Sequence, residues 1–288
     1  MSKIDGMADI RYGAIRSRRL LIDAVYALSM FKDAITVVGA HAVHEWVKET
    51  WGPVDMEATR DADITINPSF IADNPSILET LKNIGLEPAL QDRPGIYGLE
   101  GESNLPLEAR TTFDILVPES YAGGGNRAAR IPGQKNTAGR AVGLELSLWD
   151  KHLRKLATID EPIKDAEVFI AGPAALLVAK AHKIHERLEQ VMKRPDRLRP
   201  KDSGDIALLM MVSDPVEVRQ TMNNNATAHP ETAEVIRSAA NWLVEMYSDS
   251  TQVSVTRQQA ADSLAARFDE NDVFTAIDGW LKKFTDSQ

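Results

Sequence analysis

Residues Ile35–Ile66 read ITVVGAHAVHEWVKETWGPVDMEATRDADITI, and this stretch decides the fold. It begins with the short apolar run Ile35–Val38, which is typical of a buried strand and is followed directly by Gly39. A helix is predicted over Ala40–Trp51, where a Gly-Pro pair ends it, and a second strand over Ala62–Ile66. Strands and helices that alternate in this way predict a domain in which helices pack on a sheet.

The rest of the chain divides into a mixed first part and a helical second part. The predicted strands of the first part are Gly95–Gly101, Thr112–Val117, Ala141–Trp149 and Val168–Ile170. The other predicted helices are Ile15–Phe31, Asn74–Asn83, Ala174–Met192, Asp202–Val212, Pro215–Met222, Pro230–Met246, Arg257–Phe268 and Asp272–Phe284. We therefore expect an α+β fold, with a mixed sheet in an N-terminal domain over residues 1–165 and an all-helical domain over residues 166–288.

Composition excludes several classes of protein. The chain has 288 residues and no cysteine, which rules out disulfides, thiolate metal sites and cysteine nucleophiles. No apolar run approaches the roughly 20 residues of a membrane helix, and no apolar signal segment follows the N-terminus. The formal net charge of -9 argues against non-specific coating of nucleic acid. We expect a cytoplasmic protein without membrane contact.

Three aspartates lie in or beside predicted strands. Asp61 and Asp63 are two residues apart, so on a strand their side chains point to the same face, about 7 Å apart. Asp114 lies between apolar residues of the strand Thr112–Val117, where a lone carboxylate is costly to bury. Two interpretations stay open at this point. The carboxylates either share a metal ion, which would offset their repulsion, or lie on a solvated face.

Gly39 and Ala40 lie where the first strand passes into the first helix. Free backbone N–H groups at the start of a helix, together with the helix dipole, favour a phosphate group. A tight turn with close packing explains a glycine at this place equally well. The pattern therefore leaves both a nucleotide-phosphate site and a packed turn open.

In this order the residues resemble the DNA polymerase β-type nucleotidyltransferase superfamily, and within it the AbiEii-type family of abortive-infection toxins. That family has a Gly-Gly or Gly-Ser turn after its first strand, then a Thr-x-Asp-x-Asp strand and a later single aspartate. The matching residues here are Gly39-Ala40, Thr59-Arg60-Asp61-Ala62-Asp63 and Asp114.

A second group of motifs lies in the predicted helical domain. The family carries a helix with a lysine and, seven residues later, an arginine, and then a Lys-Asp-x-x-Asp segment. The matching residues are Lys180-Ala181-His182-Lys183-Ile184-His185-Glu186-Arg187 and Lys201-Asp202-Ser203-Gly204-Asp205. Lys180, either Lys183 or Ile184, and Arg187 fall on one helical face. A helix start with acids favoured by the dipole stays open as the simpler explanation of the second segment.

The resemblance implies a Mg²⁺-dependent nucleotidyltransferase that moves NMP from an NTP to a tRNA 3′ end or a protein hydroxyl. It also implies the toxin of a toxin–antitoxin system, with a cognate antitoxin as partner. Two Mg²⁺ ions would be held by Asp61, Asp63 and Asp114. The other catalytic residues would be Lys180 and Asp205, and the nucleotide-binding residues Gly39, Ala40, Thr59, Lys180, Lys183, Arg187 and Asp202.

Two positions depart from the family pattern. Ala40 offers no hydroxyl, so only backbone N–H groups could contact phosphate there. Glu57 stands where the family often has an arginine, two residues before Thr59. Two other functions therefore stay open: an antibiotic or small-molecule nucleotidyltransferase, and a catalytically inactive nucleotide-binding interaction protein.

Other polar clusters have simpler explanations. The pairs His41/His44 and His182/His185 are each three residues apart on a predicted helix, but no third ligand completes a metal site. We expect surface or packing histidines, with an RNA contact of the second pair as the alternative. The basic run 193–201 and the arginines of the first helix are expected on solvated faces, with a polyanion contact as the alternative.

Overall fold

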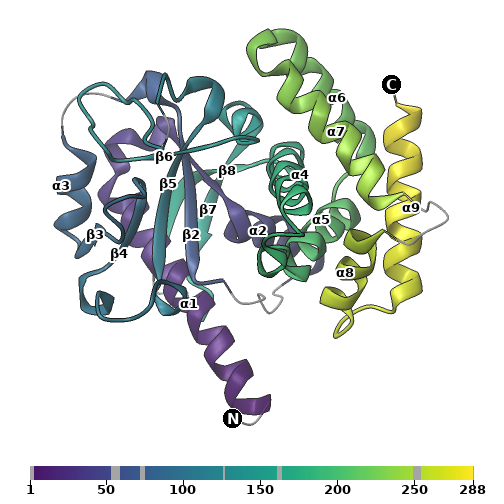
Figure 1. Cartoon of the computed structure of the whole chain (residues 1–288), viewed down its shortest axis with the longest axis horizontal. Helices are drawn as coiled ribbons and strands as arrows, with labels where there is room; N and C mark the ends of the chain where they lie inside the picture. Colours follow the sequence, from purple (N-terminus) through teal and green to yellow (C-terminus); the bar gives the residue numbers. More distant parts are fainter. Residues whose placement is uncertain are drawn as a thin grey trace. The chain divides into compact units, whose positions relative to one another are not determined.

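The computed structural model describes residues 3–52, 59–71, 75–125, 127–160, 164–248 and 254–287. Packing divides the chain into two units. Unit 1 comprises Met1–Glu45, Pro53–Ala141 and Lys151–Ala171, and unit 2 comprises Trp46–Gly52, Val142–Asp150 and Gly172–Gln288. The expected α+β fold is confirmed, with a mixed sheet in the first half of the chain and helices in the second (Figure 1). The predicted domain boundary at residue 165 stays a prediction.

Unit 1 is built on one mixed sheet with the strand order β3-β4-β5-β2-β1-β8-β7, and β6 pairs with β5. The strands are β1 Ile35–Val38, β2 Asp61–Ile66, β3 Leu86–Pro88, β4 Ile96–Leu99, β5 Thr112–Pro118, β6 Gly139–Ala141, β7 Lys151–Ala157 and β8 Asp165–Ala171. β1 runs antiparallel to β2 and parallel to β8, and β2 runs parallel to β5. The sheet therefore places β2 between the two strands that flank the predicted site.

One face of the sheet packs against the long helix α1 Lys3–Ala27, which contacts β2, β5 and β8 (Figure 1). Every second residue of β2 and β5 is apolar and fully buried, as Ile64, Phe113 and Ile115 show. This alternation is the one expected for strands with only one apolar face. A shorter helix, α3 Ile77–Lys82, packs on β3.

Unit 2 is helical. Its helices are α4 Pro173–Glu189, α5 Pro200–Val212, α6 Pro215–Ala228, α7 Ala233–Tyr247, α8 Val255–Leu264 and α9 Glu270–Asp286, and it includes the last turns of α2 Gly39–Trp51. Three of these helices begin with proline, whose missing N–H costs nothing in a first turn. No helix in the described part of the chain is long and apolar enough to cross a membrane.

Short 3-10 helices connect these elements. They are η1 Ser29–Ala34, η2 Pro68–Phe70, η3 Glu100–Glu102, η4 Leu107–Ala109, η5 Glu119–Tyr121, η6 Glu145–Leu148, η7 Pro195–Arg197 and η8 Pro230–Thr232. The helix predicted to begin at Asn74 begins at Ile77, with the Ser76 hydroxyl as its cap, and Asn74 lies outside the described residues.

The strand predicted over Ala141–Trp149 is wrong. Gly143 has a φ of +90°, which turns the backbone out of the extended form, and η6 follows it. Leucine alternates with polar residues in this stretch, and such alternation is also typical of a strand. In the structure the polar residues are buried instead, because the Glu145 carboxylate accepts a hydrogen bond from the Gly143 N–H at 2.7 Å and the Ser147 hydroxyl donates to the Leu144 carbonyl.

Candidate functional site

Three aspartates project from one face of the sheet in unit 1. β2 and β5 run parallel, with Asp61 opposite Thr112 and Asp63 opposite Asp114. Residues opposite each other on neighbouring strands point to the same face, as do residues two apart on one strand. The structure therefore brings Asp61, Asp63 and Asp114 onto the face opposite the buried Ile64 and α1, with neighbouring strands about 4.8 Å apart.

The surroundings of these carboxylates differ. Asp61 is exposed and accepts a hydrogen bond from the Thr112 hydroxyl at 3.2 Å, whereas Asp63 and Asp114 are half-buried. Like charges directly opposite each other on neighbouring strands repel. A cation at this face would relieve that repulsion.

The turn at Gly39 lies against one of these carboxylates. β1 ends at Val38, which pairs with Asp63, and Gly39 follows with a φ of +69° as the first residue of α2. A Cβ atom on Gly39 would lie 2.9 Å from Asp63 Cγ and closer still to one carboxylate oxygen. The start of α2, with its free backbone N–H groups, is therefore next to the aspartate face.

We expect Gly39→Ala to destabilise the protein more than other substitutions at a left-handed glycine. The backbone strain costs about 1–3 kcal/mol, and the added methyl group also displaces the Asp63 carboxylate. Gly52→Ala is the matched control, because Gly52 has a φ of +76° but open space around its Cβ. Urea unfolding compares the two variants, and equal losses of stability would show that the close approach to Asp63 has no energetic weight.

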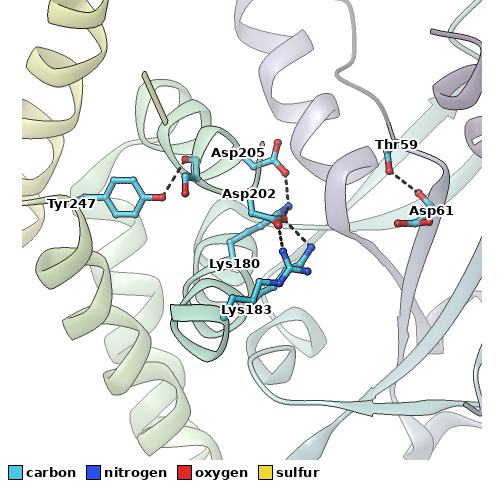
Figure 2. Close-up of polar contacts among 9 residues, drawn as sticks. Thr59, Asp61, Lys180, Lys183, Asp202, Asp205 and Tyr247 are labelled. Carbon is cyan, nitrogen blue, oxygen red and sulfur yellow. Dashed lines mark hydrogen bonds and ion pairs between the residues drawn. The ribbon is translucent and has the colours of Figure 1, made fainter. Parts of the chain in front are cut away.

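Thr59 lies just before the strand that carries Asp61 and forms a hydrogen bond with it. Its hydroxyl donates to the Asp61 carbonyl at 3.2 Å (Figure 2). The Thr59 carbonyl oxygen lies 3.0 Å from the buried Ser17 hydroxyl of α1, which is also 3.0 Å from His41 Nε2 of α2. Ser17 thus connects α1 with the two segments that carry the Gly39 turn and the aspartates, a role that no motif in the sequence indicated.

The first histidine pair packs against α1. His44 Nδ1 lies 3.2 Å from Arg18 Nη2, which also donates to the Glu45 carboxylate at 2.8 Å. Arg18 is fully buried, so the arginine that was expected on a solvated face is in fact part of the contact between α1 and α2. Burial lowers the pKa of Arg18, and the nearby Glu45 opposes that shift.

A second cluster of charged side chains joins α4 and α5 within unit 2 (Figure 2). Lys180 makes an ion pair with Asp205 and lies 3.5 Å from the Asp202 carboxylate. Lys183 donates to Asp202 at 2.8 Å, and Arg187 donates to the other Asp202 oxygen. The structure thus brings together all five residues that the sequence singled out on these helices, and three cations face two carboxylates.

The cations determine the charge state of Asp202. Burial alone would raise the pKa of this carboxyl, but Lys180, Lys183 and Arg187 together hold the pKa well below its usual range. Asp202 therefore stays ionised and keeps the three cations in place. The cluster carries one more positive charge than negative charge, which favours an anion nearby.

The start of α5 is held by Tyr247, which belongs to none of the sequence motifs, and by close packing at Gly204. The buried Tyr247 hydroxyl of α7 donates to the Ser203 carbonyl at 3.2 Å, and burial raises the pKa of this tyrosine (Figure 2). Gly204 packs against α8, where a Cβ atom would lie 2.9 Å from that of Ser263. Glycine between Asp202 and Asp205 therefore lets α5 and α8 approach closely.

Asp202 also predicts a pH dependence of stability. Its pKa is lower in the folded than in the unfolded chain, so its stabilisation is complete above the unfolded value of about 3.9. The stabilisation is lost as the pH falls through the folded value. We expect Asp202→Asn to be less stable than the wild type at neutral pH, with a gap that closes in acid. Urea unfolding at a series of pH values measures this gap, beside the exposed control Glu245→Gln. A gap that stays constant with pH would contradict the assignment.

The other polar clusters have packing partners. His185 stacks on Trp242 with ring centroids 3.7 Å apart, and His182 meets the edge of the same ring at 4.8 Å. In the basic run, Arg194 pairs with Asp196 at 3.0 Å. Glu57, the departure from the family pattern, lies outside the described residues.

In the described part of the chain, no three His, Cys, Asp or Glu side chains are grouped closely enough to hold a metal ion by themselves. This does not conflict with Mg²⁺, which usually takes one or two carboxylates together with water and substrate phosphates. The opposed carboxylates of Asp63 and Asp114 supply the hard oxygen ligands that this ion prefers. The residues present therefore fit Mg²⁺.

Comparisons of the chain with known protein families, with curated proteins and with solved structures found no match. The geometry described above is therefore the basis for assigning a function.

Proposed function

We propose that this chain is a Mg²⁺-dependent nucleotidyltransferase that moves NMP from an NTP to an acceptor in the cytoplasm. The parallel register of β2 and β5 supports the proposal most, because it sets Asp63 opposite Asp114 on one face. The Gly39 turn adds a helix start beside the same carboxylates, where a triphosphate would be favoured. The resemblance to the AbiEii-type toxins suggests that the acceptor is a tRNA 3′ end or a protein hydroxyl, and that an antitoxin is the partner.

Asp61, Asp63 and Asp114 would hold Mg²⁺, which when bound neutralises charge on the triphosphate and on the leaving pyrophosphate. The backbone N–H groups of Gly39 and Ala40 would orient the phosphates. Ala40 has no hydroxyl to add, so this contact would depend on the backbone alone.

The reaction would be an in-line displacement. The acceptor hydroxyl oxygen forms a bond to the α-phosphorus, and the bond from that phosphorus to the bridging oxygen breaks, which releases pyrophosphate. Asp114 is half-buried beside Asp63, and it would take the proton of the acceptor hydroxyl.

For unit 2 we propose an anion-binding role. Lys180, Lys183 and Arg187 would bind an anionic group of the substrate, since the three side chains converge on the same pair of carboxylates. Asp205 and Asp202 would orient these cations, as their ion pairs indicate. The net positive charge of the cluster supports this role.

The test is incubation of the purified protein with labelled NTPs, Mg²⁺ and total tRNA, beside the Asp63→Ala variant. Label that reaches tRNA or protein only with the wild type is the expected result, and the labelled fraction identifies the acceptor. Label on tRNA with both proteins, or with neither, removes tRNA as the acceptor. Growth arrest on expression, relieved by the same substitution, is the expected sign of a toxin.

A nucleotidyltransferase for antibiotics or other small molecules is the second candidate. The net charge of -9 favours it, because an acidic chain has less affinity for a polyanionic acceptor. Harmless expression together with transfer of label to a small hydroxylated acceptor would favour this function. Harmless expression without transfer to any acceptor would favour an inactive nucleotide-binding protein.

A further inference from the structure

α1 carries a partly exposed stripe that no part of the proposed activity uses. Its residues Tyr12, Arg16, Arg19, Asp23 and Tyr26 follow one another at alternating steps of four and three, which places them on one side of the helix. Tyr12 and Tyr26 are 58% and 66% exposed, and the Arg19 and Asp23 side chains are 53% and 44% exposed. Tyrosine and arginine are enriched where proteins bind each other.

A hollow of about 360 Å³ lies along the first half of this stripe. Its apolar lining comes from Ile15, Leu20 and Leu99, and its polar lining comes from Tyr12, Arg16, Arg19, Asp23 and Asp160. Arg16 lies over the Tyr12 ring, with its guanidinium carbon 5.6 Å from the ring centroid. An apolar floor with an aromatic ring and guanidinium groups at its rim suits an aromatic side chain from outside.

The stripe is complementary to itself when two copies of α1 run antiparallel. A two-fold axis level with residue 21 places Arg19 opposite Asp23 of the second copy, and Asp23 opposite Arg19. The same axis places Arg16 opposite Tyr26 of the second copy, beside the hollow. A two-fold interface repeats each contact, so the stripe would make two ion pairs and two cation–π contacts.

We propose that two copies of this chain associate through their α1 stripes, antiparallel, and that Tyr26 of each copy fills the hollow of the other. Within one chain, Arg16 already pairs with Glu102, Arg19 pairs with Asp160, and Asp23 accepts from Lys164 at 2.7 Å. A guanidinium has five donors and a carboxylate about four acceptor sites, so each group can bind a second partner. Charge complementarity across the axis favours a second copy over an unrelated helix.

One helix pair buries less surface than a standard interface of about 1,600 Å². We therefore expect a reversible dimer with a Kd in the micromolar range, roughly -8 kcal/mol at 1 μM. Sedimentation equilibrium of the full chain over a concentration series should show a monomer–dimer equilibrium.

The charge pair gives the decisive variants. Arg19→Asp and Asp23→Arg each place like charges opposite one another twice across the axis, and each should weaken the dimer at least about tenfold. The double variant Arg19→Asp/Asp23→Arg restores opposite charges across the axis, although it opposes like charges at Asp160 and Lys164 within each chain, and it should associate more tightly than either single variant. Arg237→Asp, at an exposed position of α7, is the control that should leave association unchanged.

Tyr26→Ala tests the hollow independently of the charges. Tyr26 is largely exposed, so this variant should fold normally and still dimerise at least about tenfold more weakly. A wild-type chain that stays monomeric at every concentration overturns the proposal. Association that Arg19→Asp and Tyr26→Ala leave intact also overturns it, as does a double variant that associates no more tightly than either single charge variant.

Discussion

Asp114→Asn should reduce nucleotide transfer by about a thousandfold or more, because it removes a ligand worth several kcal/mol of charge stabilisation. The stability of the folded protein should not decrease. Asp114 lies opposite Asp63 on the neighbouring strand, and removal of one of two facing negative charges should raise the free energy of unfolding by up to about 1 kcal/mol. Activity and stability are therefore expected to change in opposite directions.

Three measurements separate this expectation from simple damage to the fold. Urea unfolding gives the stability, and single-turnover transfer from labelled NTP gives the rate. Thermal unfolding with Mg²⁺ and a non-hydrolysable NTP should raise the Tm of the wild type but not that of the variant. Glu87→Gln, which removes an exposed carboxylate on β3 of the same sheet, is the matched control. An active Asp114→Asn protein would rule out the aspartate face as the reaction centre.

Lys180→Met should cost about 3–5 kcal/mol of stability, because it leaves a buried carboxylate without its partner. The Lys180 and Asp205 side chains are 7% and 8% exposed, so water cannot replace the lost ion pair. Lys183→Met is the control. Its side chain is 44% exposed and contacts Asp202, so we expect a loss within about 1 kcal/mol.

The double variant Lys180→Met/Asp205→Leu should recover much of that loss, since apolar residues of similar size can replace a buried ion pair. Transfer activity should stay low in the double variant, because one of the positive charges proposed to bind an anionic group of the substrate is gone. A double variant as unstable as Lys180→Met would mean that the lysine stabilises the helices by packing rather than by pairing with Asp205.

The strands around the aspartates could be predicted closely from the sequence. β1 was predicted with its observed bounds, and β2 and β5 to within a residue, because each is a short apolar run closed by a turn residue. β7 was missed. It reads KHLRKLA, an edge strand with basic side chains and little apolar alternation, and it has no apolar pattern to detect.

The arrangement of the site could be predicted only in part. The spacing of Asp61 and Asp63 fixes their common face, but no local pattern shows that β5 lies beside β2 with Asp114 opposite Asp63. Pairing between strands far apart in sequence depends on the whole core. The same holds for Ser17, whose neighbours His41 and Thr59 are distant in sequence. The ion pairs of α4 and α5 were expected only because the family resemblance named their residues.

Unit 2 is assembled from three separate pieces of the chain, and this limits how the gene can be divided. A fragment that starts at Gly172 lacks Val142–Asp150, and so lacks η6, which packs on α4 and α7. Leu146 and Leu148 of that piece are buried, so their removal would leave the apolar surface beneath them open to water. We therefore expect that a fragment starting at Gly172 does not fold stably when it is expressed alone, and that a stable version of unit 2 must also contain Val142–Asp150.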